Sequence, residues 1–120
     1  MSHSILVVDD NEQVREVLRR KLESCGYDVC EAADGKEAMR ALQTVPFDLI
    51  VTDIMMPEQD GLETICRIRK ELPGLKIIAI SAPSNETFLN DADRLGAARV
   101  FEKPLKLADL ATAVEELLAE

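Results

Sequence analysis

Short runs of apolar residues alternate along the chain with stretches whose apolar residues recur at helical spacing. Such runs are typical of buried strands, and the 3.6-residue spacing is typical of helices with one buried face. Gly26 and Pro46 follow two of the helical stretches, where they favour helix termination. Asp60 and Glu63 are spaced like an N-cap and its N3 partner. The pattern predicts strands over 5–8, 27–30, 49–51, 77–80 and 100–101, and helices carrying the apolar positions of 14–22, 38–45, 62–68, 88–95 and 107–118.

These alternating elements predict an α/β fold. Strands that are apolar throughout indicate a parallel sheet covered by helices on both faces. Strand–helix alternation implies right-handed crossovers, so we expect a doubly wound, five-stranded parallel sheet. A chain of 120 residues suits one compact domain, and no repeat, low-complexity tract or linker marks a boundary within residues 1–120.

The composition of the chain limits the kinds of partner and site that it can have. The net charge is −9, with 23 acidic against 14 basic side chains, which speaks against direct nucleic-acid binding. No apolar run approaches the roughly 20 residues of a membrane-spanning helix, and no secretory signal is visible. Cys25, Cys30 and Cys66 are odd in number and form no C-x-x-C pair, which argues against a zinc site or a disulfide framework. We expect them to be small buried hydrophobes in a cytoplasmic protein.

Polar side chains stand where the predicted strands end. Asp9 and Asp10 follow the first strand, Asp53 the third, Ser81 the fourth and Lys103 the fifth. In open α/β sheets ligands bind beyond these carboxyl ends, so the five side chains should meet at one edge. Crowded carboxylates repel one another unless a cation intervenes, and Mg²⁺ takes oxygen ligands and often bridges a carboxylate to a phosphate. The lysine and the hydroxyl suit phosphate oxygens, and a carboxylate can act as the nucleophile that forms an aspartyl-phosphate. The cluster therefore predicts phosphoryl transfer to an aspartate.

The whole chain also resembles the bacterial response-regulator receiver domain, the CheY-like family of two-component signalling. The resemblance rests on four segments in order, each at a predicted strand end: VVDDN at 7–11, VTDIMMP at 51–57 with DG at 60–61, ISA at 80–82 and KP at 103–104. It implies a flavodoxin-like (β/α)5 fold with strand order 2-1-3-4-5.

The resemblance implies a role for each matching residue. Asp53 matches the phosphate-accepting aspartate, and Lys103 the lysine that contacts a phosphoryl oxygen. Pro104 matches a proline that follows a cis peptide bond. Ser81 matches the switch hydroxyl that turns toward the phosphoryl group, and Phe101 the switch ring that then packs inward.

The resemblance also implies a bound Mg²⁺ or Mn²⁺. Its expected ligands are Asp10, Asp53 and the backbone carbonyl of Met55, with Asp9 acting through water. Met55 and Pro83 would flank the path of the hydrolytic water, and neither side chain can orient it. We therefore expect a long-lived phosphoryl group.

In this family the phosphoryl donor is a phosphohistidine on a histidine kinase or a histidine phosphotransfer protein. The resemblance thus implies a signalling switch rather than an enzyme, since a receiver catalyses only its own phosphorylation and dephosphorylation. Its output would be a changed surface formed by the helix of 88–95, the strand of 100–101 and the helix of 107–118. A downstream protein partner would recognise that surface, with no direct contact to nucleic acid or membrane.

Three enzyme or cofactor classes fit less well, and one simpler interpretation stays open. A phosphatase of the haloacid-dehalogenase type needs a second Asp two residues after a nucleophile at the end of the first strand, but position 11 is Asn. A flavin phosphate would be repelled by the acidic loop after the first strand. A P-loop NTPase needs G-x-x-x-x-G-K, which is absent. A purely structural interaction module remains open, although it leaves the acidic cluster unexplained.

Overall fold

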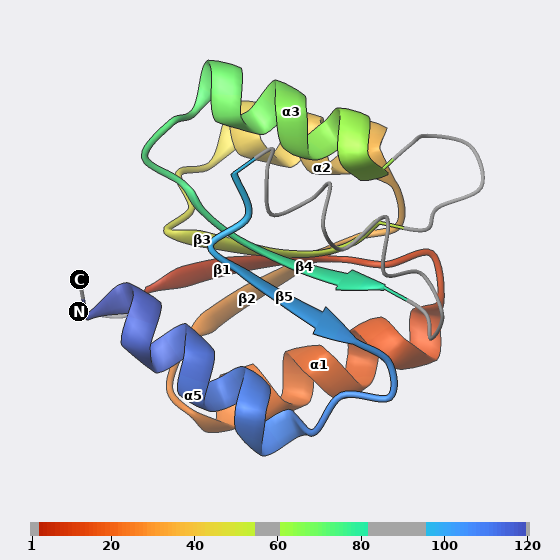
Figure 1. The fold of residues 1–120 in the computed structure, drawn as a ribbon, viewed down its shortest axis with the longest axis vertical. Coiled ribbons are helices and arrows are strands. Elements are labelled where there is room, and N and C mark those ends of the chain that lie inside the picture. The colour runs from red at the N-terminus through yellow and green to blue at the C-terminus, as the bar shows by residue number, and fades with distance from the viewer. Residues whose placement is uncertain (1–2, 55–60, 82–95, 120) are drawn as a thin grey trace.

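A five-stranded parallel sheet lies between two layers of helices in the computed structural model, which describes residues 3–54, 61–81 and 96–119 (Figure 1). The strand order is β2-β1-β3-β4-β5, which confirms the order implied by the family resemblance. The strands are β1 (Ser4–Val8), β2 (Asp28–Ala32), β3 (Leu49–Asp53), β4 (Lys76–Ser81) and β5 (Arg99–Glu102).

The described helices cover the two faces of the sheet in pairs. Helices α1 and α5 lie on one face, and α2 and α3 lie on the other (Figure 1). Among the described helices, none is both long and apolar enough to cross a membrane. The helix predicted over 88–95 and the predicted cap at Asp60 lie outside the described residues. The helices are α1 (Glu12–Ser24), α2 (Gly35–Thr44), α3 (Gly61–Glu71) and α5 (Leu107–Leu118).

Strand β1 shows why its sequence is apolar at consecutive positions. Leu6 and Val8 pack into the core beneath α2 and α3, whereas Ile5 and Val7 pack into the core beneath α1 and α5. Successive side chains of a strand point to opposite faces, so a strand covered on both sides must be apolar at every position. Burying a side chain of this size contributes about 1.5–3 kcal/mol.

Two polar caps and one glycine define the ends of the helices nearest the site. The Asn11 side chain accepts from the backbone N–H groups of Gln13 and Val14 at the start of α1. Asp34 accepts from a backbone N–H in the first turn of α2. Gly26 has φ of +97° just past α1, a left-handed conformation that glycine adopts without steric cost, so it ends the helix as predicted.

The cysteine prediction was wrong. Cys25, Cys30 and Cys66 are all exposed. Cys30 lies on β2, which is an edge strand of the sheet, and Cys66 follows the buried Ile65 on α3. An apolar residue beside a buried stripe is covered only if another element packs on it, and this cannot be read from spacing alone.

Two further details of the sequence prediction change. The second strand, predicted over 27–30, runs from Asp28 to Ala32. Val17, expected on the buried face of the first helix, is 50% exposed, while Leu18 and Leu22 of the same helix are buried.

Candidate functional site

The parallel sheet brings the predicted polar residues to one edge. Val8, the last residue of β1, pairs with Thr52, so Asp9 and Asp53 are the next residues along two neighbouring strands. Asp53 pairs with Ile80, which places Ser81 one residue further along β4. Because all the strands run in the same direction, the residues at their carboxyl ends lie together.

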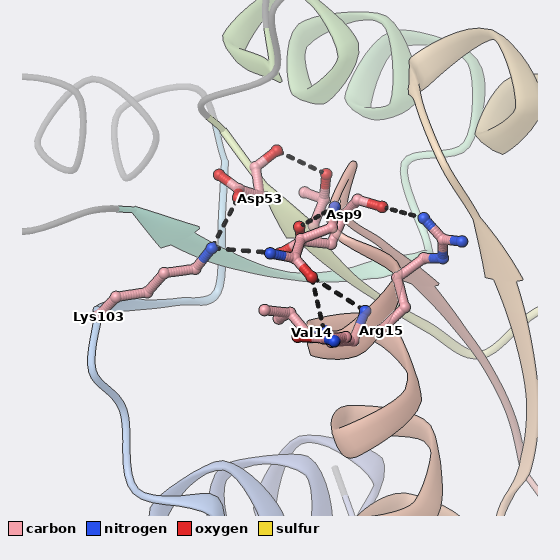
Figure 2. Close-up of polar contacts among 8 residues, drawn as sticks. Asp9, Val14, Arg15, Asp53 and Lys103 are labelled. Atoms are coloured by element: carbon pink, nitrogen blue, oxygen red, sulfur yellow. Dashed lines mark hydrogen bonds and ion pairs between the residues drawn. The ribbon is translucent and has the colours of Figure 1, made fainter.

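Lys103 connects this edge of the sheet to two buried carboxylates. Its Nζ donates to Asp53 Oδ2 at 2.9 Å and to Asp9 Oδ2 at 3.3 Å (Figure 2). The side chains of Asp53 and Asp9 are only 5% and 2% exposed, and that of Lys103 is 27% exposed. The backbone N–H of Lys103 also donates to the carbonyl of Ser81 at 2.6 Å, which fixes the start of the loop after β5. The Lys103 ammonium therefore lies beside Asp53, the carboxylate that the family resemblance implies is the phosphate acceptor.

The loop after β1 is held by several hydrogen bonds centred on Asp9. The N–H of Asn11 donates to Asp9 Oδ1 at 2.8 Å. The guanidinium of Arg15 donates through Nη1 to the backbone carbonyl of Asp9 at 2.7 Å (Figure 2). The N–H of Asp9 donates to the carbonyl of Ala32 on β2 at 3.2 Å. Both peptide groups beside the Asp9 side chain are thus fixed by the surrounding structure.

The three carboxylates at this edge could share a cation. One oxygen each from Asp9, Asp10 and Asp53 lie within 4.8 Å of one another. Asp9 and Asp53 are buried and Asp10 is exposed, so the cluster opens to solvent on the Asp10 side. An all-oxygen, all-carboxylate donor set suits a small hard dication such as Mg²⁺. The residues present therefore fit the metal that the sequence predicts.

The electrostatics of Asp9 and Lys103 are coupled through these contacts. Burial raises the pKa of Asp9 above its ordinary 3.8; the hydrogen bond from Asn11 lowers it, and the charge of Asp53 raises it further. Partial burial works to lower the pKa of Lys103, but the hydrogen bond and charge of Asp53, joined by Asp9, outweigh it and raise the pKa above 10.5. Lys103 therefore stays protonated, and a second cation would relieve the remaining repulsion between the carboxylates.

The two switch candidates occupy different environments. Ser81 is fully buried, and within the described part of the chain its Oγ has no hydrogen-bond partner. A buried hydroxyl without a partner is costly, so a new acceptor beside it would be stabilising. Phe101 is partly buried and packs against the core beneath α1 and α5, and it pairs in register with Ile80.

Two of the remaining sequence predictions fall outside the described residues and one is confirmed. Met55, expected to offer its carbonyl to the metal, and Pro83, expected beside the hydrolytic water, lie in the ranges 55–60 and 82–95. The Lys103–Pro104 peptide bond is cis, as the resemblance implied.

Sequence reasoning missed two residues that hold the loop, Asn11 and Arg15. Asn11 gave a usable signal, since an Asn just before a helical apolar pattern is a strong N-cap candidate. Arg15 gave none, because the carboxylate of Glu31 that pairs with it at 3.1 Å lies on a different strand. Only the packing of α1 beside β2 brings the two together.

Comparison with protein-family models matches residues 5–115 to the response regulator receiver domain. The response regulator receiver protein CpdR of Brucella abortus is 38% identical over 114 residues, covering 95% of this chain and 95% of CpdR. The sensor kinase CckA of the same species is 35% identical over 119 residues, covering 98% of this chain and 13% of the kinase. Related sequences thus occur both as a protein of similar length and as a small part of a sensor kinase.

Solved structures give the same picture. The receiver domain of NtrX from Brucella abortus superposes with a TM-score of 0.90 at 32% identity, covering 96% of this chain and 98% of that one. A CheY-like receiver domain protein from Methanospirillum hungatei superposes with a TM-score of 0.94 at 28% identity, covering 99% of this chain and 95% of that one. The fold is therefore that of CheY-like receivers.

Proposed function

This chain belongs to the response regulator receiver domain family of two-component systems, and from that membership we propose that Asp53 accepts a phosphoryl group from a partner's phosphohistidine in a Mg²⁺-dependent reaction. On this proposal the protein is a signalling switch that catalyses only its own phosphorylation and dephosphorylation. The observation that carries the proposal is the position of Lys103, whose ammonium lies 2.9 Å from Asp53 beside a carboxylate cluster able to hold a metal.

The proposed chemistry is a displacement at phosphorus. A carboxylate oxygen of Asp53 attacks the phosphorus atom while the bond to the donor imidazole nitrogen breaks, and that nitrogen keeps the electron pair. Because the donor imidazole reacts with a proton on its other ring nitrogen, the products are an aspartyl-phosphate and a neutral histidine. Lys103 is near enough to donate to a phosphoryl oxygen as charge builds up there. When bound by Asp10, Asp53 and the Met55 carbonyl, with Asp9 acting through water, Mg²⁺ or Mn²⁺ would supply further positive charge to the phosphoryl oxygens.

Ser81 offers a way to couple the phosphoryl group to conformation. A phosphoryl oxygen near the end of β4 would give its buried Oγ an acceptor that no described residue provides. A hydrogen bond to a charged group contributes about 1.5–3 kcal/mol. Moving a switch from about 1% to 99% active takes about 5.5 kcal/mol, so this bond supplies part of the energy and repacking of Phe101 would have to contribute the rest.

We propose a histidine kinase or a histidine phosphotransfer protein as the donor, which the match to part of a sensor kinase supports. An apolar groove lined by Val14, Val17, Leu105 and Leu107 adjoins Lys103, which suits a protein donor better than a small molecule. The 50% exposed Val17 would be covered when such a donor docks.

The proposed output is recognition of a surface that includes β5 and α5 by a downstream protein. The net charge of −9 supports a protein partner over nucleic acid or an anionic membrane. The same proposal places the protein in the cytoplasm, where sensor kinases present their phosphohistidines.

The test is intact mass after incubation with phosphoramidate, with Mg²⁺ or with EDTA, for wild type, Asp53→Asn and Asp28→Asn. Asp28 is an exposed carboxylate at the start of β2, at the opposite end of the strands, and serves as the matched control. We expect one phosphoryl group on wild type and Asp28→Asn only with Mg²⁺, and none on Asp53→Asn. A wild type that stays unmodified while binding Mg²⁺ and remaining folded would instead favour an interaction module that works without phosphorylation.

A further inference from the structure

Arg15 makes a contact that the proposed reaction leaves unexplained. Its Nη1 donates to the backbone carbonyl of Asp9 at 2.7 Å, although Arg15 is on α1 and Asp9 is in the loop before it (Figure 2). The side chain is only 15% exposed, so it lies back along the protein surface instead of extending into solvent. A bond from a charged donor is roughly twice as strong as one between neutral groups.

Glu31 holds this arginine in place. Its Oε1 accepts from Arg15 Nε at 3.1 Å, and its Oε2 lies 2.9 Å from Nε of Arg19, one helical turn along α1. One carboxylate on β2 thus bridges two guanidinium groups of α1, which would otherwise repel each other. Because Nε of Arg15 is occupied by Glu31, the planar guanidinium is left with Nη1 directed at the loop.

The carbonyl that Arg15 holds belongs to the peptide group joining Asp9 to Asp10. A peptide group is planar, so fixing its carbonyl limits the backbone torsions on either side and hence the direction of the Asp10 side chain. Asp10 is the exposed member of the carboxylate cluster, and its carboxylate accepts no hydrogen bond from another described residue. Within the described part of the chain, the orientation of the Asp10 side chain therefore depends on its own backbone.

We infer that Arg15, held by Glu31, is a positioning residue that orients Asp10 for cation binding. The inference deepens the proposed function, since it rests on Mg²⁺ binding at Asp9, Asp10 and Asp53. Neither side chain of the pair is assigned to touch the metal or the phosphoryl group.

Charge and positioning predict opposite effects when Arg15 is replaced by glutamine. If Arg15 acted only as a nearby positive charge, removing it would strengthen Mg²⁺ binding at a carboxylate cluster. If it orients Asp10, removing it should weaken binding despite the more negative site. Loss of groups that orient metal ligands typically costs about 10–100-fold in affinity. The direction of the change therefore separates the two roles.

The experiment measures the Kd for Mg²⁺ by calorimetric titration of the full chain as wild type, Arg15→Gln, Arg15→Lys, Glu31→Gln and Arg20→Gln. Arg20 is the matched control, since it also lies on α1 but pairs with Glu16 at 2.7 Å on the exposed side. We expect Arg15→Gln to bind Mg²⁺ about tenfold more weakly than wild type, and Glu31→Gln to lose less affinity than Arg15→Gln does. Arg15→Lys should also bind more weakly, because a lysine cannot contact both Glu31 and the carbonyl. The Kd of the Arg20→Gln control should stay within about twofold of the wild-type Kd.

A metal-free readout accompanies the titration. The NMR cross-peak that links the Asp9 carbonyl to the Asp10 amide reports directly on the bond that Arg15 makes. It should shift in Arg15→Gln and in Glu31→Gln but not in Arg20→Gln. If Arg15→Gln does not fold, Arg15→Lys carries both measurements, because it keeps the positive charge and loses only the geometry of the guanidinium.

The outcomes separate this inference from the proposed function. Suppose that wild type binds Mg²⁺ and that the Arg15 and Glu31 variants bind it as tightly as Arg20→Gln does. That result overturns the positioning role alone. A wild type that binds no Mg²⁺ overturns the metal dependence of the proposed function and the role in cation binding together. Weaker binding with a shifted cross-peak supports the positioning role.

Discussion

Replacing Lys103 with methionine should destabilise the metal-free protein by about 3 kcal/mol. The change keeps the length of the side chain but removes the ammonium that lies 2.9 Å from Asp53 and 3.3 Å from Asp9. Removing one partner of a buried ion pair costs about 3–5 kcal/mol, because the other charge stays buried and unpaired. We take the lower end of this range, since Lys103 is 27% exposed and water screens part of the interaction.

The assay is thermal unfolding followed by circular dichroism, with EDTA and then with saturating Mg²⁺. For a domain of this size about 1 kcal/mol corresponds to about 4 °C in Tm, so Lys103→Met should melt about 12 °C below wild type in EDTA. A bound Mg²⁺ would neutralise the same carboxylates, so the difference should fall to less than about half with the metal. Lys70→Met, which removes an exposed lysine of α3, should change Tm by no more than about 2 °C.

The pH dependence of this difference follows from the pKa of Lys103. Its pKa is raised above 10.5 in the folded protein, so its stabilising contribution is fully present below 10.5 and is lost as the pH rises through the raised value. The gap between wild type and Lys103→Met should therefore persist at neutral pH and close only in alkali. A Tm difference between wild type and Lys103→Met below about 4 °C in EDTA would refute the reasoning, as would a difference of equal size with and without Mg²⁺.

Three further predictions test other parts of the structure. In urea unfolding, unmodified Ser81→Ala should be as stable as wild type or up to about 1 kcal/mol more stable, because the change removes a buried hydroxyl without a described partner. A clear loss of stability would contradict this. Gly96→Ala should lower the free energy of unfolding by about 1–3 kcal/mol, since Gly96 has φ of +115° and an added Cβ would lie 2.7 Å from Arg69 Nε. Gly74→Ala is the control, because nothing lies within 4 Å of its added Cβ and the stability should change little. The pKa of Asp9 is raised by burial, so its protonated form stabilises the metal-free fold below 3.8 and this contribution disappears as the pH rises through the raised pKa. Urea unfolding in EDTA should therefore show wild type losing stability relative to Asp9→Asn as the pH rises, and a pH-independent difference would count against the raised pKa.

The layout of the site could be predicted from the sequence because it depends on local pattern and chain direction. Apolar runs ending in Asp9, Asp53, Ser81 and Lys103 predict strands whose polar ends share one edge, since parallel strands place their carboxyl ends on the same side of a sheet. The strand order came from the family resemblance, because periodicity alone does not say which strands are neighbours.

Which side chains touch was decided by tertiary packing. That Lys103 reaches both Asp53 and Asp9, and that Asp10 is left exposed, depends on where the loops after β5 and β1 lie relative to the end of β3. The pairing of Arg15 with Glu31 joins a helix to an edge strand, and no short-range pattern indicates it.

Exposure likewise depends on what lies opposite each residue. The spacing of Val17 and Cys66 matches a buried helical stripe, yet both are exposed because no described element covers that side of the helix. The sequence by itself determined the strand–helix alternation and the edge at which the polar side chains gather, because both follow from periodicity and chain direction. The tertiary structure decided the contacts, the burial and hence the pKa values of Asp9 and Lys103, because these depend on neighbours distant in the chain.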